Sequence, residues 1–120
     1  MATKGTKGIA RLINATRFSL QGLKAAFQNE EAFRQEVYLS LFLIPIGLCF
    51  GNSGIERAML ISALLIVMVT ELVNSGLEAV VDRLGGEIHE LSGRAKDIGS
   101  AAVLIALVNA VIVWVLILIY

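Results

Sequence analysis

The sequence predicts an all-α membrane protein, with three transmembrane helices preceded by an amphipathic helix at the membrane surface. Of its 120 residues, 57% are hydrophobic and only 17% are charged, and the mean hydropathy is +0.78. A soluble domain of this size would leave too much apolar surface in water. Long segments that are nearly free of charge also alternate with short polar connections. We expect a single domain over residues 1–120.

The last of the three expected spans, about 97–120, is the clearest. Residues 98–120 carry no charged side chain, and a helix of that length rises about 34 Å, enough to cross a bilayer with some tilt. The first span, about 32–51, is weaker because a proline interrupts its apolar run, and the GNSG sequence at 51–54 predicts a tight turn after it. The second, about 56–82, is apolar enough only if its glutamates are tolerated in the membrane.

Residues from about 6 to 28 predict an amphipathic helix. Its apolar face contains Ile9, Leu12, Ile13, Leu20, Leu23 and Phe27. Arg11, Arg17 and Lys24 lie beside or across from that face, so the helix is suited to the membrane interface, with its basic groups near anionic headgroups. An amphipathic helix packed on protein would give the same pattern. Phe18 falls on the polar side and fits neither interpretation.

The basic residues predict the orientation of the spans. Six of the ten precede the first span or lie at its start, one lies in the first loop, and three lie around the second loop. In chain order they are Lys4, Lys7, Arg11, Arg17, Lys24, Arg34, Arg57, Arg83, Arg94 and Lys96. Three spans place the N-terminus and the second loop on one side of the membrane, and the positive-inside rule makes that side cytoplasmic.

Composition also argues against several classes of function. The formal net charge is zero, which argues against nucleic acid as a partner. The lone Cys49 cannot form an intrachain disulfide, and no CxxC spacing indicates a metal site; we interpret it as a small apolar residue packed in a helix. The N-terminal residues carry charges throughout and no continuous apolar core, so we expect no cleavable signal peptide.

Three polar residues inside the second span are the most informative feature of the chain. At 100° per residue, Glu71, Asn74 and Glu78 fall on one stripe of the helix, and Asp82 extends it. A carboxylate in the hydrocarbon region costs about 3 kcal/mol or more, so it is rarely kept without a use. The stripe suggests a charged site near a membrane surface. Polar contacts between helices or a proton or ion relay would also explain these residues.

The stripe continues into a polar second loop, which offers carboxylates, basic groups and His89. Such a set can supply oxygen ligands to a hard cation, donors to phosphate and a general base. Magnesium takes one or two carboxylates together with substrate phosphates, and Glu30 is expected at the same depth. The sequence contains no GxxxxGK[ST], GxGxxG, HRD or DFG motif, so any nucleotide site differs from those of P-loop proteins and protein kinases. His89 has no second His or Cys at ligand spacing, which makes it a weak metal candidate.

The segment 71–106, ELVNSGLEAVVDRLGGEIHELSGRAKDIGSAAVLIA, resembles the bacterial integral-membrane diacylglycerol kinase family. The family signature runs Glu-x-hydrophobic-Asn-Ser/Thr-small-hydrophobic-Glu-x-x-Val-Asp. Its elements here are Glu71, Val73, Asn74, Ser75, Gly76, Leu77, Glu78, Val81 and Asp82. The stretch GLKAAFQNEEAFRQE also resembles the family's lead into the first span. The similarity covers nearly the whole chain.

The resemblance implies a homotrimer in the bacterial inner membrane with active sites shared between subunits. It implies transfer of the γ-phosphoryl group of Mg-ATP to the free hydroxyl of diacylglycerol, giving phosphatidic acid. By the same resemblance, Glu71 is the general base, Asn74 positions the reacting groups, and Glu30 and Glu78 hold the metal. The implied ATP contacts are Arg11, Phe18, Glu30, Glu78, Glu87, His89, Lys96 and Asp97, and the implied lipid contacts are Arg11, Glu71, Ser100 and Trp114. Phe18, where relatives usually have Tyr, and Asn14, where a basic residue is common, depart from the pattern.

Three other functions stay open at the level of sequence. A kinase for another lipid alcohol, such as undecaprenol, would use the same scaffold. A small channel or proton-conducting protein would use the buried glutamates as a relay. A non-catalytic membrane-assembly protein is the third possibility, and neither of these two functions needs contacts to a nucleotide. The polar second loop favours a kinase over the last two. Ala102, Ala106 and Ala110 recur at four-residue intervals in the third span and allow close helix approach, within one subunit or between subunits.

Overall fold

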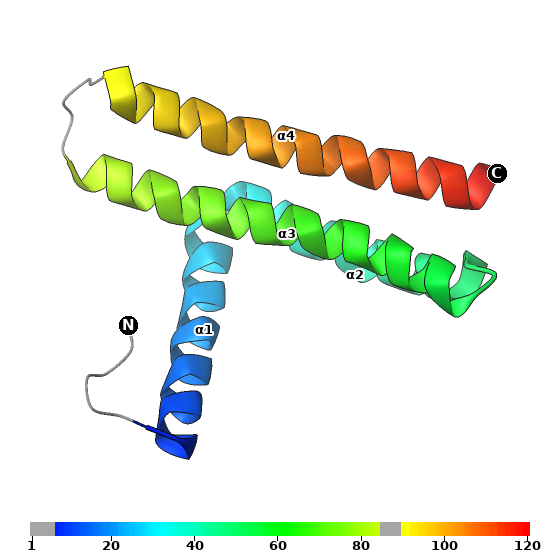
Figure 1. Cartoon of the computed structure of the whole chain (residues 1–120), viewed down its shortest axis with the longest axis horizontal. Helices are drawn as coiled ribbons and strands as arrows, with labels where there is room; N and C mark the ends of the chain where they lie inside the picture. Colours follow the sequence, from blue (N-terminus) through cyan, green and yellow to red (C-terminus); the bar gives the residue numbers. More distant parts are fainter. Residues whose placement is uncertain (1–6, 85–89) are drawn as a thin grey trace.

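The computed structural model describes residues 7–84 and 90–120, and this part of the chain forms four helices (Figure 1). They are α1 (Ile9–Asn29), α2 (Glu31–Phe50), α3 (Gly54–Arg83) and α4 (Glu90–Ile119). Helices α2, α3 and α4 lie side by side, with the turn between α2 and α3 at the same end as the C-terminus. Helix α1 runs transverse to these three and projects away from them.

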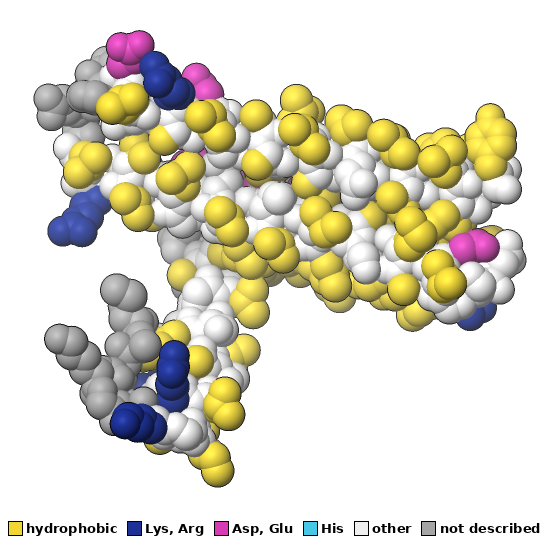
Figure 2. Space-filling model, viewed as in Figure 1, with side chains coloured by type: hydrophobic (Ala, Val, Ile, Leu, Met, Phe, Trp, Pro, Cys, Tyr) yellow, Lys and Arg dark blue, Asp and Glu magenta, His cyan; other side chains and the backbone are white. Residues whose placement is uncertain are grey.

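Helices α2, α3 and α4 are each long and apolar enough to cross a membrane. Figure 2 shows hydrophobic side chains over the length of this face of the bundle, with the charged groups gathered towards its ends and on α1. The predicted class, an all-α membrane protein with three spans, is confirmed. Two details add to the expectation: helix α4 begins at Glu90, before the expected span starts near 97, and α2 continues through Pro45 without a break.

The corner between α1 and α2 consists of one residue. Glu30 ends α1 and begins α2, and its extended backbone (φ −115°, ψ 107°) turns the chain. The Nη1 atom of Arg34 donates to the carbonyl oxygens of Phe27 and Gln28, at 2.8 and 3.0 Å. These carbonyls belong to the last turn of α1, where the helix itself offers no donors. Because Arg34 is on α2, the two bonds fix the direction in which α1 leaves the bundle.

The predicted tight turn between α2 and α3 is present. Ser53 precedes α3, and its hydroxyl accepts a hydrogen bond from the Glu56 amide at 3.1 Å. The Glu56 carboxylate in turn accepts from the Asn52 amide at 3.3 Å. This reciprocal arrangement closely resembles a capping box. Arg57 donates from Nε to the Leu48 carbonyl at 3.0 Å, so an arginine caps the end of α2 much as Arg34 caps α1.

Helix α3 lies at the centre of the packing. Its buried residues recur at intervals of three or four, and they are Leu60, Ala63, Leu64, Val67 and Glu71. The buried residues of α4 are smaller, namely Gly99, Val103 and Ala106. Between membrane helices, small residues of this kind allow backbones to approach closely. Far from Glu71, the indole Nε1 of Trp114 donates to the Leu60 carbonyl at 3.1 Å.

The capping role of Arg34 leads to a first prediction. Arg34→Met should lower the free energy of unfolding by about 2 kcal/mol, because two charge-assisted bonds to α1 are lost. It should also speed tryptic cleavage of α1. Thermal unfolding in detergent and timed proteolysis measure these effects. Arg94→Met is the matched control, because it removes the same charge from an exposed pair with Glu90 that contributes less than about 1 kcal/mol. Equal behaviour of the two variants would contradict the capping role.

Candidate active site

The buried stripe of α3 changes from apolar to polar along its length. Leu64 and Val67 are followed on the same face by Glu71, Asn74 and Glu78, since residues three or four apart share a helix face. Glu71 is only 8% exposed, so its carboxyl group is placed inside the helix packing rather than against lipid. The three-residue stripe predicted from the sequence therefore has a definite place, at the end of the buried face of α3.

Asn74 connects this stripe to its neighbours. Its Nδ2 atom donates to Oε1 of Glu78 at 3.1 Å, which holds the two side chains one turn apart. Its Oδ1 atom is buried and has no hydrogen-bond partner among the described residues. The carboxamide is therefore oriented by one bond only, and its oxygen is turned towards Gly99 of α4.

Three carboxyl groups lie within electrostatic reach of Glu71. The charges of Glu78, on α3, and Glu30, at the α1–α2 corner, act on Glu71. Glu71 in turn acts on Glu36, which is contributed by α2. Mutual repulsion among these groups favours the binding of a cation between them.

The same carboxyl groups limit what kind of metal site can form. In residues 7–84 and 90–120, no group of three or more His, Cys, Asp or Glu side chains is arranged to hold a metal ion. Within the described part of one chain, no more than two carboxylates are therefore placed to serve one ion. Magnesium is typically bound in this way when substrate phosphates complete its coordination. Glu30 and Glu78 provide oxygen ligands of the required type, so the residues present fit this metal.

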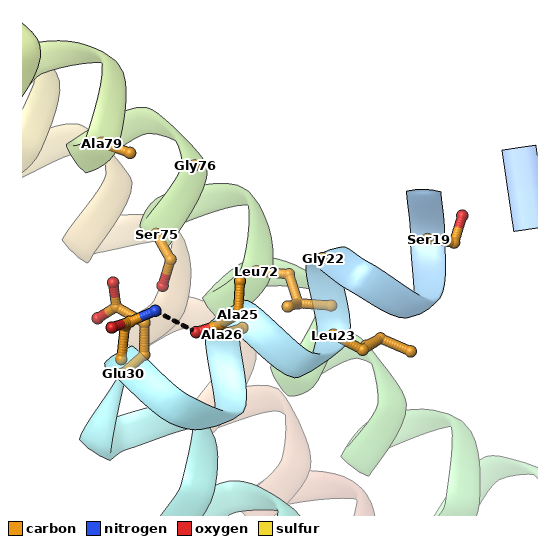
Figure 3. A pocket seen from close by; sticks show the side chains of 11 residues that line it. Ser19, Gly22, Leu23, Ala25, Ala26, Glu30, Leu72, Ser75, Gly76 and Ala79 are labelled. Atoms are coloured by element: carbon orange, nitrogen blue, oxygen red, sulfur yellow. Dashed lines mark hydrogen bonds between the residues drawn. The ribbon is translucent and has the colours of Figure 1, made fainter. Parts of the chain in front are cut away.

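A groove of about 770 Å³ lies between α1 and α3 beside these carboxyl groups (Figure 3). Most of its lining is small or polar: Ser19, Gly22, Ala25, Ala26, Asn29, Glu30, Ser75, Gly76 and Ala79. Leu23 and Leu72 complete it. The Ser75 side chain points from α3 towards the end of α1 where Glu30 lies. The groove thus combines space with oxygen-bearing side chains.

A second groove, of about 510 Å³, lies between α1 and α2. Its lining is mainly apolar, and it includes Phe27, Phe33, Val37, Leu41, Ile44 and Met68. Leu23 borders both grooves. The α2 residues that line it lie within the candidate membrane span Glu31–Phe50. Helix α1 therefore separates a mainly apolar groove from one that contains carboxyl and hydroxyl groups.

The polar ends of α3 and α4 are joined by an ion pair. Nζ of Lys96 lies 2.6 Å from Oδ1 of Asp82, and both side chains are substantially exposed. Asp82 is one turn beyond Glu78 on α3, so the pair places the Lys96 ammonium group at the open end of the polar stripe. A cation at that position is suited to contact an anionic ligand that reaches the stripe from water.

Comparison with known proteins identifies the family. The family model for prokaryotic diacylglycerol kinase matches residues 17–118. Diacylglycerol kinase of Haemophilus influenzae is 57% identical over 109 residues, which cover 91% of this chain and 92% of the relative. The chain belongs to the prokaryotic diacylglycerol kinase family. Diacylglycerol kinases of Escherichia coli K12 and Pseudomonas aeruginosa are 52% and 47% identical, over 94% and 96% of this chain and 93% and 94% of their own lengths.

Some of the residues predicted from the family resemblance lie together in the structure. Glu30, Glu71, Asn74 and Glu78 form the cluster described above. Lys96 is at its open end, whereas the neighbouring Asp97 is exposed and Ser100 is exposed further along α4. Two further predictions, Glu87 and His89, lie outside the described residues. The roles proposed for all of these residues stay predictions.

Other predicted residues lie away from the cluster. Arg11 is exposed, and its separation from Glu30 by 19 positions corresponds to about 28 Å of helix. The Arg17 guanidinium lies 5.5 Å from the centre of the Phe18 ring and donates to Asn14 at 3.3 Å. Both positions that depart from the family pattern therefore contact Arg17.

Trp114 is also distant from the cluster. Its ring packs against Gly47 and its indole group bonds to Leu60. Leu60 and Glu71 are 11 positions apart, which corresponds to about 16 Å of helix.

Sequence reasoning missed two residues near the candidate site and the ion pair made by a third. Glu36 was not singled out, although an acid at the start of a span deserves the same scrutiny as one inside it. Asp82 was recognised as part of the stripe, but its pairing with Lys96 depends on how α3 and α4 pack. Gly99 carries no side chain, and the sequence identifies it only as a small residue in a membrane helix, with nothing that links it to the site.

The position of Trp114 leads to a second prediction. Trp114→Phe removes one neutral hydrogen bond and should lower the free energy of unfolding by about 1 kcal/mol. The KM for diacylglycerol, the substrate in the relatives' names, should not change. Thermal unfolding and lipid-dependent kinetics measure the two quantities, with Tyr120→Phe as an exposed aromatic control on the same side of the bundle. A raised KM at unchanged stability would instead support the predicted lipid contact.

Proposed function

We propose that this protein transfers the γ-phosphoryl group of ATP to the free hydroxyl of diacylglycerol, giving phosphatidic acid. The observation that carries the proposal is the buried Glu71, which lies within electrostatic reach of Glu30 and Glu78 at the point where α1 meets α3. The names of the relatives support the same reaction. The position of the cluster explains how a lipid and a water-soluble nucleotide can meet there.

The lipid acceptor is proposed to approach from the membrane. The apolar groove between α1 and α2 has room for acyl chain and includes Met68 of α3, one turn before Glu71. A diacylglycerol whose chains lie in or beside this groove would present its hydroxyl near headgroup depth. Glu71 accepts the hydroxyl proton as the new bond to phosphorus forms, and it is suited to this role because nothing else among the described residues is bonded to its carboxyl group.

ATP is proposed to enter from the opposite side of α1. The groove between α1 and α3 would hold the nucleotide, with Glu30 and Glu78 as ligands of Mg²⁺ and Lys96 near the phosphates. Bound Mg²⁺ supplies neutralisation of phosphate charge. Asn74 holds the Glu78 carboxylate in place. The bond from the γ-phosphorus to its bridging oxygen breaks, a bond to the diacylglycerol oxygen forms, and ADP leaves.

We also propose a homotrimer with active sites shared between subunits. Two observations support it: α1 projects away from its own bundle (Figure 1), and Arg11 lies about 28 Å of helix from Glu30. An Arg11 that contacts ATP would therefore serve a neighbouring subunit. The charge distribution supports an orientation in the bacterial inner membrane with the N-terminus and the α3–α4 connection in the cytoplasm.

A relay across the membrane is less well supported than a kinase. On the buried face of α3, the positions before Glu71 are Leu60, Ala63, Leu64 and Val67, all apolar. A proton or ion path would need polar groups or water through that region. In the described helices the polar stripe occupies only one end of α3, as expected for a site that opens to one side.

The third prediction tests the reaction and the base. Purified protein in lipid or detergent should transfer phosphate from radiolabelled ATP to diacylglycerol. Glu71→Gln should lower kcat by about 100-fold or more, the usual contribution of a general base, while the oligomer stays folded. Glu56→Gln is the matched control, because it changes an acid at the opposite end of α3. Transfer to undecaprenol but not to diacylglycerol would contradict the substrate, and an active Glu71→Gln variant would contradict the base.

The fourth prediction tests shared sites. Arg11→Met and Glu71→Gln should each have low activity as pure oligomers. When the two variants are unfolded, mixed and refolded together, some sites would combine Arg11 from one subunit with Glu71 from another, so activity should recover. Phosphatidic acid production measures the recovery, with each variant refolded alone as the control. No recovery in oligomers shown by tagging to contain both chains would argue that each site is built from one subunit.

A further inference from the structure

Helix α4 contributes space to the polar cluster at Gly99, a residue that has no side chain. Gly99 is buried on the face of α4 that packs against α3. A Cβ atom built there would overlap Oδ1 of Asn74 and lie 3.2 Å from its Cγ. The other nearest atom is Cδ2 of Leu77 at 3.2 Å, the end of a flexible side chain that can move. The group that an alanine at this position would displace is therefore the Asn74 carboxamide.

The orientation of that carboxamide follows from its two neighbours. An ionised Glu78 carboxylate can only accept hydrogen bonds, so the amide nitrogen of Asn74 faces it, at 3.1 Å. The amide group is planar, and its oxygen must then point the other way, into the space beside Gly99. Among the described residues this oxygen has no hydrogen-bond partner, which is unfavourable for a buried acceptor. The bond to Glu78 and the free space at Gly99 together explain why the orientation is kept.

We propose that Gly99 is a positioning residue for phosphoryl transfer. By leaving the volume of a side chain to the Asn74 carboxamide, it holds Asn74 against Glu78 and thereby orients a carboxylate that serves the metal. Helix packing of this density does not absorb an added methyl group without moving a neighbour. The inference rests on the proposed function, in which Asn74 and Glu78 take part. Gly99 acts only through Asn74.

Gly99→Ala, compared with Gly93→Ala, tests the proposal. Gly93 is in the same helix, and a Cβ there would have no atom of the described residues within 4 Å. Gly99→Ala should lower kcat for diacylglycerol by about tenfold, the effect of losing one bond to a charged group. It should also raise the Mg²⁺ concentration needed for half-maximal activity, as we expect of Asn74→Ala. Gly93→Ala should match the wild type in both. Wild-type kcat and Mg²⁺ dependence in Gly99→Ala would overturn the proposal.

A double variant separates positioning from general helix packing. If Gly99 acts through Asn74, then Asn74→Ala with Gly99→Ala should be no less active than Asn74→Ala alone, because the shortened side chain leaves room for the methyl group. If Gly99→Ala lowers activity by the same factor in the wild type and in Asn74→Ala, the proposal is overturned. Should Gly99→Ala fail to fold, recovery of folding in the double variant supports it, and an equally unfolded double variant overturns it. An inactive wild-type chain would instead contradict the proposed function.

Discussion

The packing of α3 on α4 is the constraint on which the fold and the site both depend. Two apolar helices in a membrane gain little from the hydrophobic effect, so they associate through close packing and a few hydrogen bonds. Here α4 presents small buried residues, including Gly99 and Ala106, to the buried face of α3. At one end the Trp114 indole bonds across to Leu60. At the other end, Asn74 occupies the space beside Gly99. The interface that holds the helices together is thus continuous with the polar cluster.

The transverse direction of α1 is a second consequence of local bonding. A one-residue corner at Glu30 allows the chain to turn, and the Arg34 guanidinium fixes the turn by capping the last carbonyls of α1. The edge-to-face contact of Phe27 with Tyr38, at 5.7 Å between ring centres, supports the same arrangement. Because of this corner, Glu30 is brought to α3 instead of continuing along the line of α2.

Much of the fold could be predicted because hydropathy reports directly on membrane spans. Hydropathy detects the apolar part of a helix rather than its full length. For this reason it placed the third span near 97, although α4 begins at Glu90 with two turns that are charged but still helical. Pro45 was expected to weaken the first span, yet α2 continues past it. In an apolar helix, the cost of losing one backbone donor is smaller than the cost of exposing several unpaired groups to lipid.

Only the part of the candidate site that lies on a single helix could be predicted. Helical periodicity placed Glu71, Asn74 and Glu78 on one face, because that depends on α3 alone. The roles of these residues came from the family resemblance, since the same stripe is compatible with a relay or a structural network. Glu36 and Gly99 were missed because their proximity to Glu71 and Asn74 depends on the rotation and spacing of neighbouring helices, which periodicity within a single segment does not report.

A kinase for a membrane lipid must bring together one substrate dissolved in water and one dissolved in the bilayer, and the two environments meet only at the interface. Helix α1 lies between two grooves there, and Leu23 borders both. Along α3, Met68 borders the apolar groove, whereas Leu72 and Ser75 border the other. Glu71 comes between these positions in the chain. Under the proposed function, a base at that level would reach a hydroxyl from the membrane side and a phosphate from the water side, and this use would offset the cost of a carboxyl group in an apolar helix.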